Sequence, residues 1–307
     1  MTLMFEKLVI EMCQYMTIKA CGKLVRENDM RVWRSVLHHV SLARNLELYT
    51  DVTKIGIDDK SYQKGHKYVS VVVDLDKKKV ICVVKGRDHN SLDEFVNDFK
   101  AHGGIPSNIE ITTCDMSIAF KHGVKHYFNN TKIIIDKFHV YKYINDALNN
   151  VRRMESKDNK TLKRSRFLFL KSPESLNEKS KYRRDLLLEL NPLTCIAYSA
   201  KLELERIYNE SKNKGEAMIC FNNLINLMLS SKLLPLIEVA KTFKNNLDKI
   251  CEYFDERYTN AILEGFNSRI QECKSRAKGF SNLNYFKFII YLVCGKLNYE
   301  NNFHLKC

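Results

Sequence analysis

The sequence Lys54-Ile55-Gly56-Ile57-Asp58-Asp59 joins a short apolar run to a pair of carboxylates. Such a run predicts a buried strand, over 54–58, that carries an acid at its carboxyl end. Burying a carboxylate is costly unless a metal ion or a charged partner compensates it. The stretch therefore predicts a functional site at this end of the strand, provided that other acids meet Asp58 there.

Five short apolar runs predict an α/β fold with a mixed sheet. The expected strands cover 54–58, 68–75, 80–85, 109–114 and 132–135, and helices over 91–102 and 117–128 separate the last three. A meander of three strands followed by alternating helices and strands is the ribonuclease H-like topology, in which strands one and four are neighbours. Asp58 and Asp115, which end those two strands, would then lie at one edge, where open α/β sheets place their sites.

The first 44 residues are helical in pattern. Thr17 begins a short second helix, and Asp29 is the expected N-cap of a third helix over 30–40. Two short helices around a tight turn predict a helix-turn-helix, and an ordinary helical hairpin is the alternative. The third helix would direct Val32, Val36 and Leu37 inward and Arg31, Arg34 and His38 toward a DNA groove.

The charge balance indicates a polyanionic partner. The 307 residues include 45% hydrophobic residues, which suffices for a real core, and they carry a net charge of +14 with a pI of about 9.2. A globular chain this basic most often meets nucleic acid; an anionic membrane surface and a generic basic surface are the alternatives.

The ten cysteines are scattered, and none lies in a C-x-x-C pair, so the sequence contains no local zinc knuckle. Such spacing is typical of reduced intracellular thiols. No stretch is long and apolar enough to span a membrane. These features predict a soluble, cytoplasmic protein.

The region 137–255 is almost wholly helical in pattern and strongly basic at its start. Residues 137–190 carry 14 Lys and Arg against 7 Asp and Glu, with Phe167, Phe169 and Tyr182 interleaved. A one-sided charge with aromatic residues favours a surface that follows DNA phosphates, although a solvated face is the common alternative. Leucine-rich runs over 186–190 and 224–236 are expected in core helices. The candidate phosphate ligands are Arg152, Arg153, Lys163, Arg164, Arg166, Arg183 and Arg184.

A late helix over 258–278 supplies a third acid. Its apolar stripe contains Phe266 and Ile270, and Glu264 borders that stripe, where it can reach over the edge of a sheet. A packing helix over 281–297 follows. Clustered carboxylates bind hard divalent cations such as magnesium, and two such ions can activate an attacking hydroxyl and stabilise the leaving oxygen of a phosphodiester.

In order along the chain, these blocks resemble those of the bacterial DDE transposases of the ISL3 insertion-sequence family. The resemblance covers nearly the whole chain. It rests on Ile55-Gly56-Ile57-Asp58-Asp59, Lys64-Gly65-His66-Lys67-Tyr68, Cys114-Asp115-Met116, Asp136-Lys137-Phe138-His139-Val140, Ile262-Leu263-Glu264-Gly265-Phe266-Asn267 and Lys278-Gly279-Phe280-Ser281-Asn282.

The resemblance implies a catalytic triad of Asp58, Asp115 and Glu264 that binds two Mg²⁺ ions, for which Mn²⁺ substitutes. It implies cleavage of double-stranded DNA at the terminal inverted repeats of a transposon and transfer of the freed strand into target DNA. It further implies a homo-oligomer in a synaptic complex, located at the nucleoid of a prokaryote. A helical insertion between the second Asp and the Glu is also implied, and the basic helical region fits it.

The chain departs from the family pattern in two places. Family members usually carry Asp-Glu where this chain has Asp58-Asp59, and the choice of Asp58 over Asp59 rests on the resemblance. They also usually begin with a cysteine-paired zinc-binding segment, which predicts that this chain is a truncated or split reading frame. Asp136 and His139 form a D-x-x-H block that is either an accessory to the site or a structural pair, whereas His66 is expected to be structural.

These observations predict four segments. They are a helix-turn-helix segment over 1–47, a first part of the catalytic core over 48–145, a basic helical insertion over 146–255 and a last part of the core over 256–307. Two other functions use the same residues. One is a ribonuclease H-like structure-specific nuclease, and the other is an inactive DNA-binding relic of a transposase.

Overall fold

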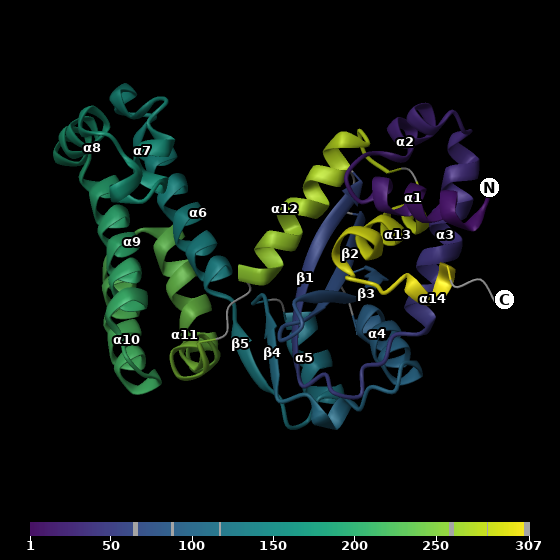
Figure 1. The fold of residues 1–307 in the computed structure, drawn as a ribbon. Helices are drawn as coiled ribbons and strands as arrows, with labels where there is room; N and C mark the ends of the chain where they lie inside the picture. The colour runs from purple at the N-terminus through teal and green to yellow at the C-terminus, as the bar shows by residue number, and fades with distance from the viewer. Residues whose placement is uncertain (64–66, 87–88, 117, 258–260, 281, 304–307) are drawn as a thin grey trace. The chain divides into compact units, whose positions relative to one another are not determined.

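A computed structural model of the chain describes residues 1–63, 67–86, 89–116, 118–257, 261–280 and 282–303 (Figure 1). The chain divides into two compact units. The first contains Met1–Ile133 and Asn260–Cys307, and the second contains Ile134–Thr259. The second unit thus contains the whole predicted helical insertion over 146–255, and the first contains most of the other three predicted segments.

A mixed five-stranded sheet has the order β3-β2-β1-β4-β5. β1 pairs with β2 and β2 with β3 in antiparallel fashion, whereas β1 and β4 are parallel. The predicted neighbourhood of the first and fourth strands is therefore confirmed. The strands are β1 (Lys54–Gln63), β2 (Lys67–Asp74), β3 (Lys79–Lys85), β4 (Ile111–Cys114) and β5 (Lys132–Ile135).

The first strand is longer than expected. The prediction that it ends at Asp58 is wrong, because β2 pairs with β1 as far as Gln63, which lies opposite Lys67. β4 pairs only with the first three residues of β1, and the last of these pairs joins Gly56 to Thr113. The remainder of β1 extends past β4 and stays paired with β2. Its polar side chains can therefore reach solvent without loss of strand pairing. Asp58 thus lies inside a strand, two residues beyond its parallel pairing.

Two helices cover one face of the sheet. They are α4 (His89–Ala101) and α5 (Ile118–Tyr127), and Phe95 and Phe99 of α4 pack with Ile55 and Ile57 of β1. α4 begins two residues before the predicted cap. Ser91 is therefore not the N-cap, and its hydroxyl instead donates to the carbonyl of Lys85 at 3.1 Å.

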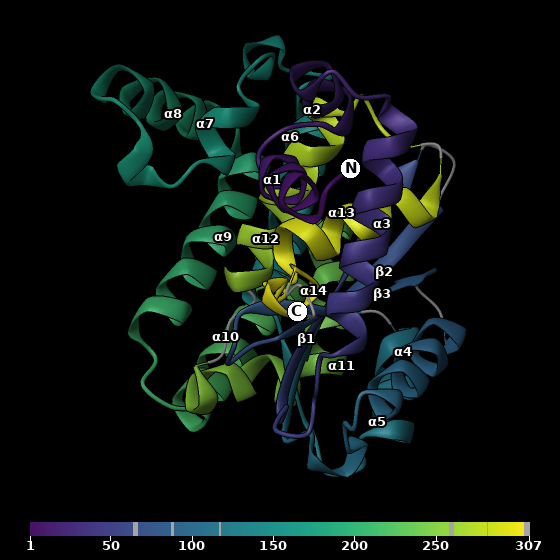
Figure 2. The ribbon, with the colours of Figure 1, turned by 45° about the vertical axis from the view of Figure 1, so that its right-hand side comes forward.

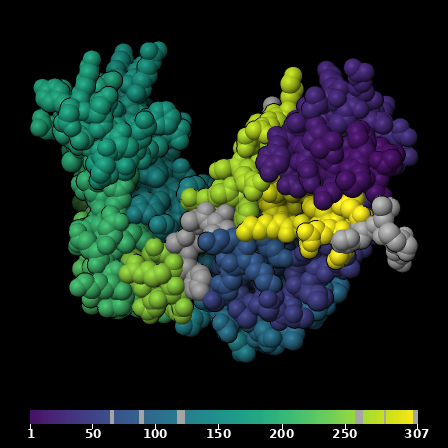
Figure 3. Space-filling view, in the orientation of Figure 1, coloured from purple at the N-terminus to yellow at the C-terminus, as the bar shows by residue number. Residues whose placement is uncertain are grey.

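The opposite face packs against the two ends of the chain. Val69 and Val71 of β2 share a core with Phe266 of α12 (Ala261–Arg276) and Phe286 of α13 (Leu283–Cys294). Three N-terminal helices complete this core, and Figures 2 and 3 show them beside the C-terminal helices. They are α1 (Leu3–Cys13), α2 (Ile18–Val25) and α3 (Asp29–Asn45), and a short α14 (Glu300–Phe303) follows α13.

The third helix carries its side chains nearly as predicted. Asn28, and not Asp29, is its N-cap, since the Asn28 side chain accepts a hydrogen bond from the Met30 amide at 2.8 Å. Leu37 is only half-buried, because Ser35 and His39 take the inward positions beside Val32, Val36 and Val40. Arg31, Arg34 and His38 are exposed, as expected. Whether α2 and α3 bind DNA stays a prediction.

The second unit is all-helical within its described residues, apart from the end of β5. Its core is aromatic, with the rings of Tyr208 and Phe254 stacked at 5.2 Å. The helices are α6 (Lys137–Glu155), α7 (Arg166–Leu170), α8 (Glu178–Leu190), α9 (Pro192–Glu210), α10 (Lys214–Ser230) and α11 (Leu234–Glu256). Short 3₁₀ turns lie at Pro106–Asn108 in the first unit and at Lys160–Leu162 and Pro173–Ser175 in the second.

The leucine-rich runs of this unit are less buried than predicted. In α8 only Leu187 is fully buried, whereas Leu186 and Leu190 are exposed because they lie on the solvent side of the helix. The run over 224–236 is not one helix, since α10 ends at Ser230 and α11 begins at Leu234.

Two further observations concern the thiols and the helices. Nine cysteines form no disulfide bond within the described residues, and burial raises the pKa of Cys13 and Cys82, which keeps these thiols protonated at neutral pH. In the part of the chain that the structure describes, no helix has the length and apolar character needed to cross a membrane.

Candidate active site

Asp58 lies on the face of the sheet that α12 covers. It stands opposite Val71 in the antiparallel pairing, and directly opposed residues project to the same face. Its side chain is 12% exposed. Asp58 Oδ2 accepts a hydrogen bond from Asn267 Nδ2 of α12 at 2.6 Å and lies 3.1 Å from Lys60 Nζ. This carboxylate is therefore held between a helix and a cation.

Asp59 lies on the other face. Its Oδ1 is 2.8 Å from the hydroxyl of Ser70, a buried residue that stands opposite it on β2. Because adjacent residues of a strand project to opposite sides, Asp59 points away from the side of α12. The two adjacent carboxylates thus have separate surroundings.

Asp115 follows β4 directly and is half-buried. The last parallel pair joins Gly56 to Thr113, so a continuation of this register by two residues would set Asp58 level with Asp115. If the alternation of β4 also continues past Cys114, Asp115 projects to the same face as Asp58.

Helix α12 runs alongside β1 in the same direction. Asn267 contacts Asp58, and Lys274 Nζ donates to the carbonyl of Ser61 at 2.6 Å. Seven helical residues and three strand residues each span about 10 Å, so the two contacts fit one alignment. Glu264 is exposed and precedes Asn267 by one turn on the same side of the helix. Along the helix axis, Glu264 therefore lies about 4–5 Å before Asn267, in the direction of the end of β4.

The three acids do not form a closed metal cage. Among the residues that the structure describes, no three His, Cys, Asp or Glu side chains gather closely enough to hold a metal ion. The surroundings nevertheless contain a further oxygen, because Asn267 Oδ1 is buried and accepts no hydrogen bond from the described part of the chain. Carboxylate and amide oxygens are the ligands that magnesium prefers, so the residue types present fit this ion.

Asp136 and His139 belong to the second unit. Asp136 is buried and is the N-cap of α6, where its carboxylate accepts a hydrogen bond from the Phe138 amide at 3.3 Å. His139 is half-buried in the first turn of α6. Asp136 therefore has at least a structural role. His66 lies outside the described residues.

The predicted phosphate ligands of the second unit divide into two groups. Arg153, Lys163, Arg164, Arg166 and Arg183 are exposed, and the rings of Phe167 and Tyr182 are exposed beside them, whereas Phe169 is buried. Arg152 is buried and donates to the carbonyl of Leu162 at 3.0 Å. Arg184 is paired with Asp185 at 2.8 Å, with its side chain 12% exposed. These last two arginines face the protein, so they are poorly placed to bind phosphate.

A buried lysine of α9 holds the backbone of the segment that carries Arg166. Lys201 of α9 is 1% exposed, and its ammonium donates to the carbonyls of Phe169 and Lys171 at 3.0 and 2.9 Å. Burial lowers the pKa of Lys201, and the ion pair with Glu205 at 3.3 Å opposes that shift. Lys201 thus fastens the segment that carries Arg166 to α9, together with the contact between the rings of Phe169 and Tyr198.

We expect Lys201→Met to loosen α7 from α9. The two carbonyls would lose their donor, and leaving buried acceptors unsatisfied costs about 1–3 kcal/mol. Trypsin should then cleave after Lys163, Arg164 or Arg166 faster than in the parent protein. Lys241→Met, which changes an exposed lysine of α11, is the matched control. Equal cleavage rates in both variants would show that Lys201 does not hold the segment.

Sequence reasoning missed Asn267 and Lys60 as partners of Asp58. The sequence spacing could have indicated Asn267, because this residue follows the predicted ligand Glu264 by three positions and so lies on the same side of the helix. Lys60 shares the face of Asp58 by strand alternation, but the predicted strand ended at residue 58 and so did not include Lys60.

Comparisons with known proteins identify the family to which the chain belongs. The sequence matches the transposase family of the DDE ISL3 type over residues 55–290. It is 25% identical over 246 residues to the transposase for insertion sequence element IS1001 of Bordetella parapertussis, which covers 78% of this chain and 60% of that protein. It is 22% identical over 295 residues to the transposase for insertion sequence element IS1557 of Mycobacterium tuberculosis, with 85% and 66% covered.

The chain therefore spans less than two thirds of the length of these curated relatives. The family match covers most of the chain and contains the strand of Asp58, the end of β4 and the helix of Glu264. The protein belongs to the ISL3 family of DDE transposases.

Proposed function

We propose that this protein cleaves the ends of a transposon and joins the freed strand to target DNA, in a metal-dependent reaction at Asp58, Asp115 and Glu264. The observation that carries the proposal is the hydrogen bond between Asn267 and Asp58. It ties the helix that contains Glu264 to the strand that contains Asp58, near the level where β4 ends. Family membership and the strand order β3-β2-β1-β4-β5 support the same function.

The three carboxylates would hold two Mg²⁺ ions, and Mn²⁺ would substitute for them. When bound, such ions activate an attacking hydroxyl and neutralise charge on the phosphate and the leaving oxygen. Asn267 would orient Asp58 through its amide nitrogen and offer its amide oxygen to the site. Lys60 compensates the charge of Asp58, and its ammonium is near enough to contact a phosphate bound there.

Double-stranded DNA is the proposed substrate and partner. Exposed basic residues of the second unit, together with Phe167 and Tyr182, would bind its backbone, and residues 16–40 with Arg31 and Arg34 would contact the transposon ends. Two or more copies would assemble with both ends in a synaptic complex. Arg152 and Arg184 would stabilise the fold beneath the basic surface, because Arg152 donates to a backbone carbonyl and Arg184 is paired with a carboxylate.

The test is a cleavage and strand-transfer assay on DNA that carries the terminal inverted repeats of the surrounding element. Nicks at the 3′ ends and joined products, both dependent on Mg²⁺ or Mn²⁺, are the expected result. Cleavage of branched DNA without joining would favour a structure-specific nuclease. Binding without cleavage would favour an inactive relic.

We expect Asn267→Ala to raise the magnesium concentration needed for half-maximal nicking. Residues that orient a metal ligand typically contribute about 10- to 100-fold to metal affinity. Gln271→Ala is the matched control, because Gln271 is one turn further along α12 and its amide nitrogen contacts Ser275. A magnesium titration of the nicking rate would decide between them, and equal requirements would remove Asn267 from the site.

A further inference from the structure

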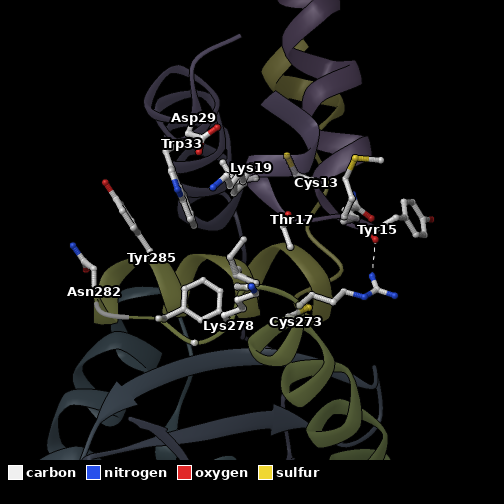
Figure 4. Close-up of a pocket in the computed structure, with 18 residues that line it drawn as sticks. Cys13, Tyr15, Thr17, Lys19, Asp29, Trp33, Cys273, Lys278, Asn282 and Tyr285 are labelled. Atoms are coloured by element: carbon white, nitrogen blue, oxygen red, sulfur yellow. Dashed lines mark hydrogen bonds between the residues drawn. The ribbon is translucent and has the colours of Figure 1, made fainter. Parts of the chain in front are cut away.

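A cavity of about 500 Å³ lies in the first unit, away from Asp58 (Figure 4). The loop between α1 and α2, the start of α3 and the turn from α12 to α13 form its walls. Its volume falls within the range of about 300–1,000 Å³ that is typical of small-molecule sites. Neither the proposed cleavage nor the basic surface of the second unit uses this cavity, although part of its lining belongs to residues 16–40, which are proposed to contact the transposon ends.

One wall of the cavity is a pair of stacked aromatic rings. Trp33 of α3 and Tyr285 of α13 have ring centroids 4.2 Å apart and an interplanar angle of 11°. Both side chains are half-buried, and Figure 4 shows the two rings side by side with Lys19 near Trp33. A flat aromatic surface of this kind can stack any nucleobase, because every base has a π-face.

The charges around the cavity favour an anion. Lys19, Lys278 and Arg276 line it, against one carboxylate from Asp29. Arg276 is engaged, since it donates to the carbonyl of Tyr15 at 2.6 Å and pairs with Glu272, so it fixes the wall. Lys19 and Lys278 are exposed and can contact a phosphate. Aromatic rings combined with cations are typical of single-stranded nucleic-acid sites.

The cavity is physically connected to the helix that carries Glu264. Arg276 ends α12, twelve residues after Glu264, which corresponds to about 18 Å along the helix. The turn that follows is tied to the end of β1, because Gln63 Nε2 donates to the carbonyl of Phe280 at 3.1 Å. With about 3.4 Å per base along a strand, this distance equals about five bases.

We propose that this cavity binds an unstacked nucleobase of single-stranded DNA. The base would stack on the Trp33 side of the aromatic wall, and Lys19 and Lys278 would bind the adjoining phosphates. The inference rests on the proposed function, in that DNA is the substrate. It adds a site that holds one strand open about five bases from the position of cleavage.

Trp33 allows a direct test, because it is the only tryptophan in the chain. Its emission should be quenched when a single-stranded thymidine oligonucleotide is added, with DNA binding followed in parallel by fluorescence polarisation of an end label. An oligonucleotide of equal length whose sugars carry no bases should bind through its phosphates but leave the emission unchanged. Equal quenching by both would overturn the proposal.

Substitutions test the same site without relying on emission. Trp33→Leu should weaken binding of the thymidine oligonucleotide by roughly 5- to 100-fold, as expected for loss of the stacking surface, and Tyr285→Leu should weaken it less, because Tyr285 only supports the Trp33 ring. Trp33→Phe retains a ring and should restore much of the affinity. Leu8→Ala, in an exposed residue of α1 that neither lines the cavity nor belongs to residues 16–40, should bind normally. Normal binding by both leucine variants would also overturn the proposal.

The outcomes separate this inference from the proposed function. If duplex ends are bound and nicked but the emission of Trp33 does not respond to single strands, only the nucleobase site is wrong. If neither duplex nor single-stranded DNA binds, both proposals fail.

Discussion

Changing Asp58 to Asn should abolish metal-dependent nicking of transposon-end DNA while DNA binding persists. The same result is expected for Asp115→Asn and Glu264→Gln. Each substitution replaces a carboxylate that is proposed to bind the metal with a neutral amide of similar size, so the fold should be preserved while affinity for a divalent cation falls. We expect a loss of at least about a thousand-fold in rate, which corresponds to about 4 kcal/mol of transition-state stabilisation.

Asp59→Asn is the matched control for this experiment. Asp59 is adjacent to Asp58 but faces the opposite side of the sheet, where Ser70 contacts it. Its substitution should leave most of the nicking activity. Nicking would be measured with Mg²⁺ and with Mn²⁺, and DNA binding would be measured by gel shift in the presence of a chelator. Full activity of Asp58→Asn combined with loss in Asp59→Asn would transfer the ligand role to Asp59.

Phe286→Ala should lower the free energy of unfolding by about 3–5 kcal/mol, the usual cost of removing a fully buried phenylalanine ring. Phe286 of α13 is 0% exposed. Its ring lies 5.1 Å from that of Phe280 and 6.4 Å from that of Tyr62, between centroids. It therefore joins α13 both to the turn after α12 and to the far end of β1, and the residual cavity would weaken both contacts.

Urea denaturation followed by circular dichroism would measure this change. Met4→Ala is a suitable control, because Met4 is 72% exposed and surface substitutions usually stay within about 0.5 kcal/mol. A change below about 1 kcal/mol for Phe286→Ala would mean that the core relaxes around the missing ring.

The order of the strands was predictable because it depends on patterns that are local in sequence. Short β-branched runs separated by polar turns specify the meander, and helical stripes specify the crossovers that make β1 and β4 parallel neighbours. Asp58 and Asp115 follow from that order, since each is near the point where parallel pairing stops. The exposed arginines of α3 were predictable for the same reason, from helical periodicity.

Other features depend on contacts between distant residues and were not predictable from one segment. The extension of β1 to Gln63 depends on hydrogen bonds to β2, which polar side chains do not signal. The burial of Arg152 depends on the carbonyl of Leu162, which a charge count cannot reveal. The role of Asn267 required the alignment of α12 with β1, a contact between residues 209 positions apart.

The anchoring of α12 to β1 has a consequence for the evolution of the family. Glu264 is positioned by contacts that Asn267 and Lys274 make within the first unit, and none of these contacts involves Ile134–Thr259. The length and composition of that helical unit can therefore diverge among descendants without displacing the third acid. Under the proposed function, recombination that exchanged the helical unit between relatives would alter how DNA is held and leave the positions of Asp58 and Glu264 unchanged.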